Sequence, residues 1–99
     1  MDKNKATSPE KKAALETIRL AFTGLSAPAQ CERLLAALKC YPISTYEAMR
    51  GLDIYAPRPR VHELRHRFGM KIQTHWVVIV TECGEKHRIG IYALESEVH

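Results

Sequence analysis

The spacing of apolar residues changes its period once along this chain of 99 residues, at Gly69. Before Gly69, apolar residues recur at steps of three and four, which is the spacing of one face of an α-helix. After Gly69, residues 72–81 alternate between two faces and are rich in β-branched and aromatic side chains, which is typical of a β-strand. The sequence therefore predicts an α+β fold, in which helices come first and a β-hairpin follows.

Four helices are predicted before the change of period. The first starts at Ser8-Pro9-Glu10, where a capping hydroxyl precedes a proline and an acid. Its apolar stripe consists of Ala14, Leu15, Ile18, Ala21, Phe22 and Leu25. The second helix follows Ser26 and Pro28 and ends near Tyr41, because Pro42 disfavours helical geometry in the residue before it. Its apolar stripe consists of Cys31, Leu34, Leu35 and Leu38.

The last two predicted helices are short and lie close together. The third is capped by Ser44 or Thr45 with Glu47 in its first turn, and Gly51 is predicted as its left-handed C-cap. The fourth starts around Ala56-Pro57 and ends at Gly69. Its predicted buried face consists of Val61, Leu64 and Phe68.

The hairpin is predicted from two strands, 72–81 and 87–94, joined by a loop at 82–86. Both faces of the first strand carry apolar side chains, so the sequence does not settle which face is inward. Three compact helices followed by a hairpin predict a winged helix-turn-helix. A helix of this kind fits the major groove of B-DNA, and the wing reaches the adjacent backbone or minor groove.

Two segments are predicted from this order: a tail and amphipathic helix at 1–25, and the winged helix-turn-helix domain at 26–96. The apolar stripe of the first helix is too large to leave in water. We expect it to form a homodimer contact, because two half-sites multiply the affinity of a DNA-binding protein. The alternative is that it packs on its own domain.

Positive charge is concentrated in one part of the chain. The net charge is +4, and residues 50–71 carry six basic side chains against two acidic ones. A cationic patch of this kind attracts polyanions. A helical wheel of the fourth helix places the predicted DNA contacts around its solvent side: Arg58, Arg60, His62, Glu63, Arg65, His66 and Arg67. Further backbone contacts are predicted at Arg50, Lys71, Lys86 and Arg88. The alternative is a basic helix that is merely solvated.

Several stretches resemble a known family. They are LLAALKCYPISTYEAM, Ile54-Tyr55 leading into RPRVHELRHRFG, IQTHWV and RIGIYAL. Residues 26–96 are similar to the small winged helix-turn-helix domains of phage and prophage genomes of proteobacteria, which share a run Arg-hydrophobic-x-x-Leu-Arg, here Arg60 to Arg65. The resemblance implies a DNA-binding domain. The first 25 residues have no counterpart in the shortest relatives, and Pro57 and Pro59 are unusually close together for a recognition helix.

A competing motif overlaps the fourth helix. His62-Glu63-Leu64-Arg65-His66 is a literal HExxH, which in zinc proteases provides two imidazole ligands and a general base. A third ligand is also needed, and His75 and His87 both fall in the predicted hairpin. The cationic residues around the motif would repel Zn²⁺. A zinc metalloprotease is therefore a remote alternative, and we expect no metal, no cofactor and no enzymatic activity.

The remaining features narrow the cellular setting. No apolar run reaches the roughly 18–20 residues of a membrane span, and the first residues lack the apolar region of a secretory signal. Cys31, Cys40 and Cys83 are odd in number and widely spaced, which predicts reduced thiols buried as small apolar residues. These features predict a cytoplasmic protein. The resemblance implies double-stranded DNA binding in the bacterial cytoplasm or nucleoid, by either a small phage-type transcriptional regulator or an architectural factor. A winged-helix adaptor for protein–protein interaction is the main alternative.

Overall fold

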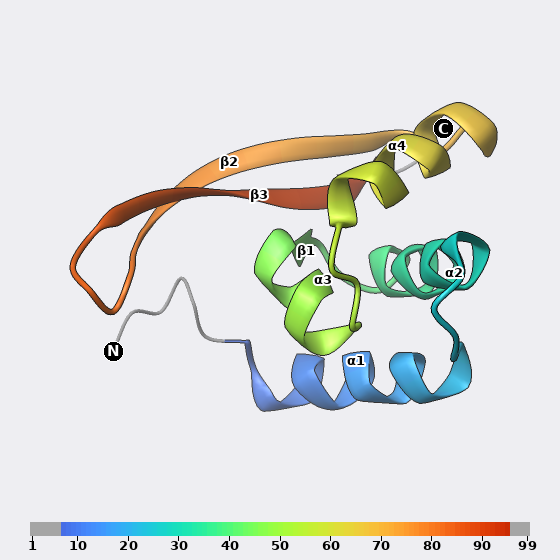
Figure 1. Ribbon diagram of the computed structural model, residues 1–99, viewed down its shortest axis with the longest axis horizontal. Helices are drawn as coiled ribbons and strands as arrows, with labels where there is room; N and C mark the ends of the chain where they lie inside the picture. Colours follow the sequence, from blue (N-terminus) through green and yellow to red (C-terminus); the bar gives the residue numbers. More distant parts are fainter. Residues whose placement is uncertain (1–6, 96–99) are drawn as a thin grey trace.

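The computed structural model describes residues 7–95, which form four helices and a three-stranded antiparallel sheet (Figure 1). The elements are α1 (Pro9–Ala21), α2 (Ala27–Leu38), β1 (Ile43–Ser44), α3 (Thr45–Gly51), α4 (Pro57–Arg67), β2 (Ile72–Val80) and β3 (Lys86–Leu94). The predicted α+β fold with an additional N-terminal helix is confirmed. Residues 1–6 of the predicted tail and residue 96 of the predicted domain lie outside the described residues.

The helices and the hairpin share one core. α1 packs against α2 and α3, on the side away from the hairpin, while α4 lies at the base of the hairpin (Figure 1). The core consists of Leu15, Cys31, Leu34, Ala37, Leu38, Ile43, Ala48, Leu52, Ile54, Val61, Leu64, Ile72 and Tyr92. Across residues 7–95, none of the helices combines the length and the apolar character that crossing a membrane requires.

Part of the predicted stripe of α1 is used within its own chain. Leu15 is fully buried, and Ile18 packs partly buried against the core. The expectation that the stripe of this helix includes Phe22 and Leu25 is wrong, because its last helical residue is Ala21. Phe22 and Leu25 consequently lie beyond the helix, and Leu25 is 78% exposed.

The helix starts follow their capping residues. The Ser8 and Ser26 hydroxyls accept hydrogen bonds from backbone N–H groups in the first turns of α1 and α2. Of the two predicted caps for α3, Ser44 is the one used. The Glu47 N–H donates to Ser44 Oγ, and the Ser44 N–H donates to Glu47 Oε1, both at 3.0 Å. α4 starts at Pro57 as predicted and has no side-chain cap.

The turn between α3 and α4 differs from the prediction. Gly51 is the last residue of α3 and not a left-handed cap, so that prediction is wrong. A Cβ added at Gly51 would lie 2.8 Å from Leu15 Cδ1, so the absence of a side chain lets α1 pack closely on α3. The left-handed residue of the turn is Asp53, with a φ of 56°, a conformation that Asp tolerates better than most residues.

The sheet has the strand order β1-β3-β2. β2 and β3 pair from Ile72 with Leu94 to Val80 with Lys86, and the two residues of β1 pair with Tyr92 and Ile91. The hairpin is confirmed, whereas β1 was not predicted. Both faces of β2 contribute buried residues, Ile72 at the base and Ile79 near the tip, on opposite sides of the strand. The hairpin therefore changes the face it turns toward the helices along its length.

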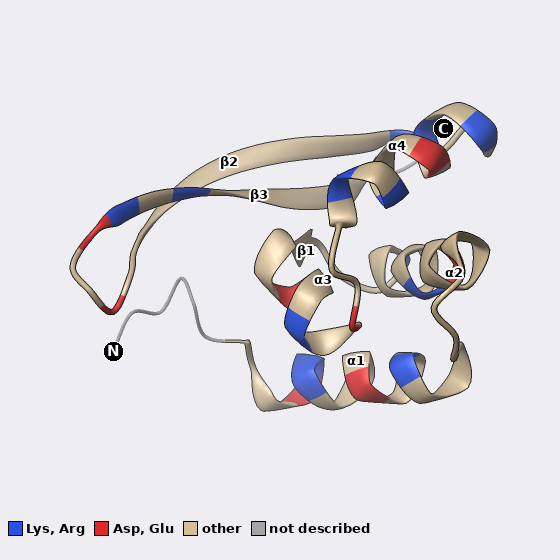
Figure 2. Cartoon of the chain, viewed as in Figure 1, with Lys and Arg blue, Asp and Glu red and all other residues tan. Residues whose placement is uncertain are grey.

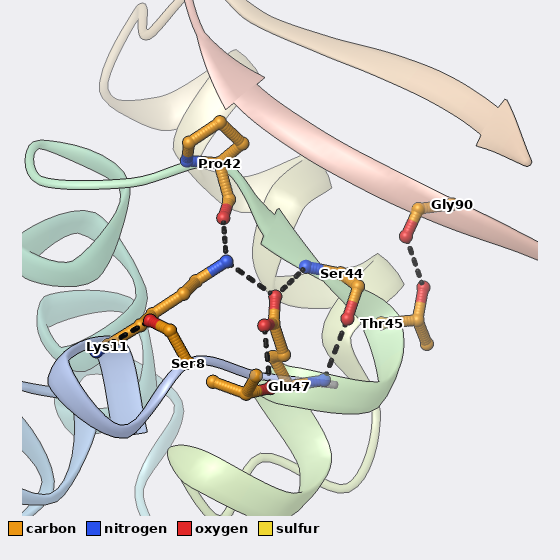
Figure 3. Close-up of polar contacts among 8 residues, drawn as sticks. Ser8, Lys11, Pro42, Ser44, Thr45, Glu47 and Gly90 are labelled. Atoms are coloured by element: carbon orange, nitrogen blue, oxygen red, sulfur yellow. Dashed lines mark hydrogen bonds and ion pairs between the residues drawn. The ribbon is translucent and has the colours of Figure 1, made fainter. Parts of the chain in front are cut away.

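A partly buried ion pair joins α1 to α3 (Figure 3). Lys11 Nζ donates to Glu47 Oε1 at 2.8 Å and to the carbonyl of Pro42 at 2.7 Å, and Thr7 Oγ1 donates to Glu47 Oε2 at 2.8 Å. Burial by itself would raise the pKa of Glu47. The hydrogen bonds from Lys11, Ser44 and Thr7, together with the charge of Lys11, outweigh burial, so this pKa lies below its ordinary value.

This network predicts a pH-dependent effect of Glu47→Gln. At pH 7 the variant should lose about 1 kcal/mol of unfolding free energy, since the ionised acceptor is removed but its amide replacement still caps α3. A depressed pKa contributes stability above the ordinary range of a glutamate, about pH 4.3, and this contribution disappears as the pH falls further. Urea unfolding at several pH values should therefore show wild type and variant converging in acid. A difference independent of pH would contradict this account.

Candidate nucleic-acid interface

α4 is anchored by two of its three predicted core residues. Val61 and Leu64 are buried in the core, and α4 packs against α2. The prediction that Phe68 belongs to the buried face is wrong, because Phe68 is 55% exposed. It follows the last helical residue, and its φ of −113° takes it off the helical period. Gly69 then turns the chain with a φ of 65°.

α4 is rich in basic residues (Figure 2), and most of its exposed side chains are polar or basic. Arg58, His62, His66 and Arg67 are exposed along it. The rings of His62 and His66, one helical turn apart, contact each other with their centroids 4.2 Å apart. Within residues 7–95, no hydrogen bond or ion pair holds the guanidinium groups of Arg58 and Arg67. These side chains can therefore reach an external partner without breaking a contact of the fold.

The edge of α4 that faces α2 holds an ion pair. Arg60 Nε lies 2.8 Å from Glu63 Oε1, and both side chains are mostly buried. The contact lacks hydrogen-bond geometry, so it joins the two residues by charge. The thiol of Cys31, on α2, donates to the carbonyl of Arg60 at 3.9 Å. Burial and the nearby Glu63 raise the pKa of Cys31, against smaller opposing effects of Arg60 and Arg67, so this thiol stays protonated.

The opposite edge of α4 is tied to β2 by Arg65. Its Nε and Nη2 donate to the carbonyl of Ile72 at 2.9 and 2.6 Å, and Nη2 also donates to Thr74 Oγ1 at 3.0 Å. These contacts fix the angle between α4 and the hairpin. Arg65, predicted as a DNA contact, is thus engaged within the fold.

The hairpin adds positive charge on β3, set back from its tip (Figure 2). Lys86 and Arg88 are exposed, and the guanidinium of Arg88 lies over the ring of Trp76, 4.6 Å from its centroid. The turn itself carries the acids Glu82 and Glu85. The wing therefore presents negative charge at its tip and cations behind it.

The two remaining predicted cations lie on different elements. Lys71 is exposed in the turn between α4 and β2. Arg50 is exposed on α3 and lies over the ring of Tyr46, at 5.2 Å from its centroid. It borders a hollow shared with Lys12 and Leu15 of α1. The structure thus brings Lys71 near α4 and places Arg50 on the side of α1.

A buried arginine was missed by sequence reasoning. Arg33, on α2, is 2% exposed and donates to the carbonyls of Leu52 at 2.8 Å, Phe22 at 2.7 Å and Gly24 at 2.8 Å, with a longer contact to Asp53. It thereby joins the loop before α2 to the turn before α4. The signal in the sequence is its position one helical turn before Ala37, at the edge of the buried face of α2.

The cysteines are only partly as predicted. Cys31 is buried, whereas Cys40 and Cys83 are exposed, so the expectation of buried thiols is wrong for two of the three. Cys40 follows the end of α2, and Cys83 lies in the turn of the wing. Both positions are surface connections, where no core is available to cover them.

The HExxH string has no zinc-site geometry around it. Glu63 pairs with Arg60 on the α2 side, while His62 and His66 point outward. Among residues 7–95, no group of three or more His, Cys, Asp or Glu side chains is placed to hold a metal ion. A third ligand and a substrate cleft are both needed for that chemistry.

Comparison with known proteins gives one match. The family model described as "Winged helix-turn-helix domain" matches residues 29–97, which include α3, α4 and the hairpin. No curated protein and no solved structure matches the chain.

Proposed function

Because the chain belongs to the winged helix-turn-helix domain family, we propose that it binds double-stranded DNA through the outward face of α4. In this proposal α4 enters the major groove and the wing lies along the adjacent backbone. The protein acts as a small transcriptional regulator or architectural factor of phage type and works without enzymatic activity. Such a protein resides where bacterial DNA is, in the cytoplasm or nucleoid.

The observation that carries the proposal is that one face of α4 is buried in the core and the other is exposed. Val61 and Leu64 anchor the helix in the core, while Arg58, His62, His66 and Arg67 face outward. A helix held rigidly by one face presents the other in a fixed geometry. Guanidinium groups bind guanine edges or phosphates, and imidazoles donate or accept hydrogen bonds with base edges.

The predicted contacts then divide into two roles. Those proposed to touch DNA are Arg58, His62, His66, Arg67, Lys71, Lys86 and Arg88. Arg60, Glu63 and Arg65 act as positioning residues, because their charged groups already bind within the fold. Arg50 lies beside α1 and supports no contact from the same face.

Fluorescence anisotropy with a labelled random-sequence duplex tests DNA binding by the wild-type protein. We expect binding at low salt that weakens steeply as salt is added. With about four phosphates neutralised, the logarithm of the association constant should fall with the logarithm of salt concentration at a slope of about −3.6. Absence of binding at low salt would contradict the proposal and favour the protein-interaction alternative. That alternative is motivated by the exposed apolar surface of the wing, including Trp76 and Val78.

A homodimer remains part of the proposed function, because paired half-sites raise the affinity for DNA. A dimer through α1 would have to use Leu20, Phe22 and Leu25, since Leu15 and Ile18 pack inside their own chain. These three residues are exposed to different extents, and two of them lie beyond the helix.

A further inference from the structure

β2 is an unprotected edge strand. It is the outer strand of the sheet, so one of its edges has no strand partner within residues 7–95 (Figure 1). Natural edge strands are usually protected by charge, proline, a bulge or a covering element. The nine residues of β2, IQTHWVVIV, contain no Lys, Arg, Asp, Glu, Pro or Gly. The outer part of β3, by contrast, carries Lys86 and Arg88.

The register of the hairpin determines which backbone groups of β2 point outward. At its two ends, the Glu95 N–H donates to the carbonyl of Lys71 at 2.7 Å, and the Thr81 N–H donates to the carbonyl of Glu85 at 2.8 Å. In an antiparallel pair, residues that exchange hydrogen bonds alternate with residues that do not. The odd-numbered residues of β2 therefore bond to β3, and the even-numbered residues direct their N–H and C=O groups to the open edge.

Arg65 covers the first of these outward groups. Its guanidinium binds the carbonyl of Ile72, as described above. The outward groups of four residues then remain along the edge: those of Thr74, Trp76, Val78 and Val80. The side chains of the last three are 53%, 55% and 48% exposed, so an apolar stripe accompanies the open edge.

We propose that β2 pairs antiparallel with β2 of a second copy, which joins the two sheets into one across a two-fold axis. Such a contact is isologous, since each copy contributes the same edge. The register that uses all four open residues pairs Thr74 with Val80 and Trp76 with Val78 of the second copy. Aromatic and β-branched side chains form favourable cross-strand pairs, and no like charges oppose each other within the two strands.

This dimer would set the spacing of the two α4 helices. The meaning of that spacing rests on the proposed DNA binding. In this register each Ile72 lies opposite residue 82 of the second copy. The two Ile72 residues are then about ten residues apart along the strands, or about 33 Å at 3.3 Å per residue. Arg65 ties α4 to Ile72 in each copy. On one side of a B-DNA duplex, adjacent major grooves are one helical turn apart, about 34–36 Å. Two recognition helices at this spacing can each enter one of these grooves.

The oligomeric state of the full chain without DNA tests the dimer, so failure here is distinct from failure of DNA binding. Sedimentation velocity from low micromolar to near-millimolar protein should show a reversible monomer–dimer equilibrium. Val78→Pro removes an outward N–H from each copy and leaves the β3 ladder untouched. We expect it to raise the dimer Kd about thirtyfold, because symmetry deletes two hydrogen bonds. Val78→Thr keeps the N–H and should leave the Kd within about threefold.

Three further variants make the test independent of folding defects in Val78→Pro. In a Cys40→Ser/Cys83→Ser background, Val77→Cys places one thiol from each copy at a closely spaced pair on the axis, and oxidation should link the dimer. Gln73→Cys lies away from the axis and should not cross-link. Leu20→Glu on α1 should leave the dimer Kd unchanged. A wild-type protein that stays monomeric, equal cross-linking at 73 and 77, or loss of the dimer in Leu20→Glu would overturn the proposal.

Discussion

Arg33→Ala is expected to lower the free energy of unfolding by about 3 kcal/mol. The guanidinium is buried and donates to the carbonyls of Leu52, Phe22 and Gly24. These carbonyls belong to two separate connections, the loop before α2 and the turn before α4. Its removal leaves a cavity and several buried acceptors without their donor, and each such loss is costly. Urea unfolding followed by circular dichroism measures the change.

Two matched variants separate this role from a general effect of charge. Arg58→Ala makes the same chemical change on an exposed side chain and should alter stability by less than about 0.5 kcal/mol. Arg33→Lys keeps the charge but lacks the planar fork that reaches several carbonyls, so it should recover only part of the loss. A cost below about 1 kcal/mol for Arg33→Ala would contradict the structural role assigned to this residue.

The double variant Arg58→Glu/Arg67→Glu is expected to weaken binding to duplex DNA about a hundredfold or more at low salt. Both side chains are exposed on α4 and make no hydrogen bond or ion pair within residues 7–95, so their replacement should leave the fold intact. Each reversal removes a phosphate contact and adds repulsion. The salt slope should also become shallower by about 2, one for each lost phosphate contact.

The matched control for charge is Lys12→Glu/Arg19→Glu on α1. It changes the net charge by the same amount on the side away from the hairpin. The expected loss of affinity is about threefold, which reflects long-range attraction alone. An equal loss in the α1 and α4 variants would show that net charge governs binding, and not the proposed face of α4.

Local patterns predicted most of the helices and the hairpin, because each depends on neighbouring residues. Val61 and Leu64 follow the helical period, and the Ser44–Glu47 capping box is contained within four residues. β1 escaped prediction because two residues form a strand only by pairing with the distant Tyr92 and Ile91. Leu15 of α1 packs close to Gly51, a contact that the local sequence does not show, and the left-handed residue is Asp53 in place of Gly51.

The sequence predicted which face of α4 forms the candidate interface. It did not predict which side chains of α4 have partners within the fold. A helical wheel separates Val61 from His62, yet it cannot show that Arg65 meets Ile72 of another element. The same limit applies to Arg33, whose acceptors lie in two loops that are remote in sequence. Arginines with internal partners and arginines that face solvent carry the same charge, so composition does not distinguish them.

Backbone amide mapping by NMR tests the central claim most directly. A ¹⁵N-labelled sample is titrated with a short duplex at low salt, and shifts are followed for each residue. The account predicts that the largest changes fall on α4 from Arg58 to Arg67 and on Lys86 and Arg88 of the wing, while the amides of α1 stay in place. Changes concentrated on α1, or none at saturating duplex, would contradict the account.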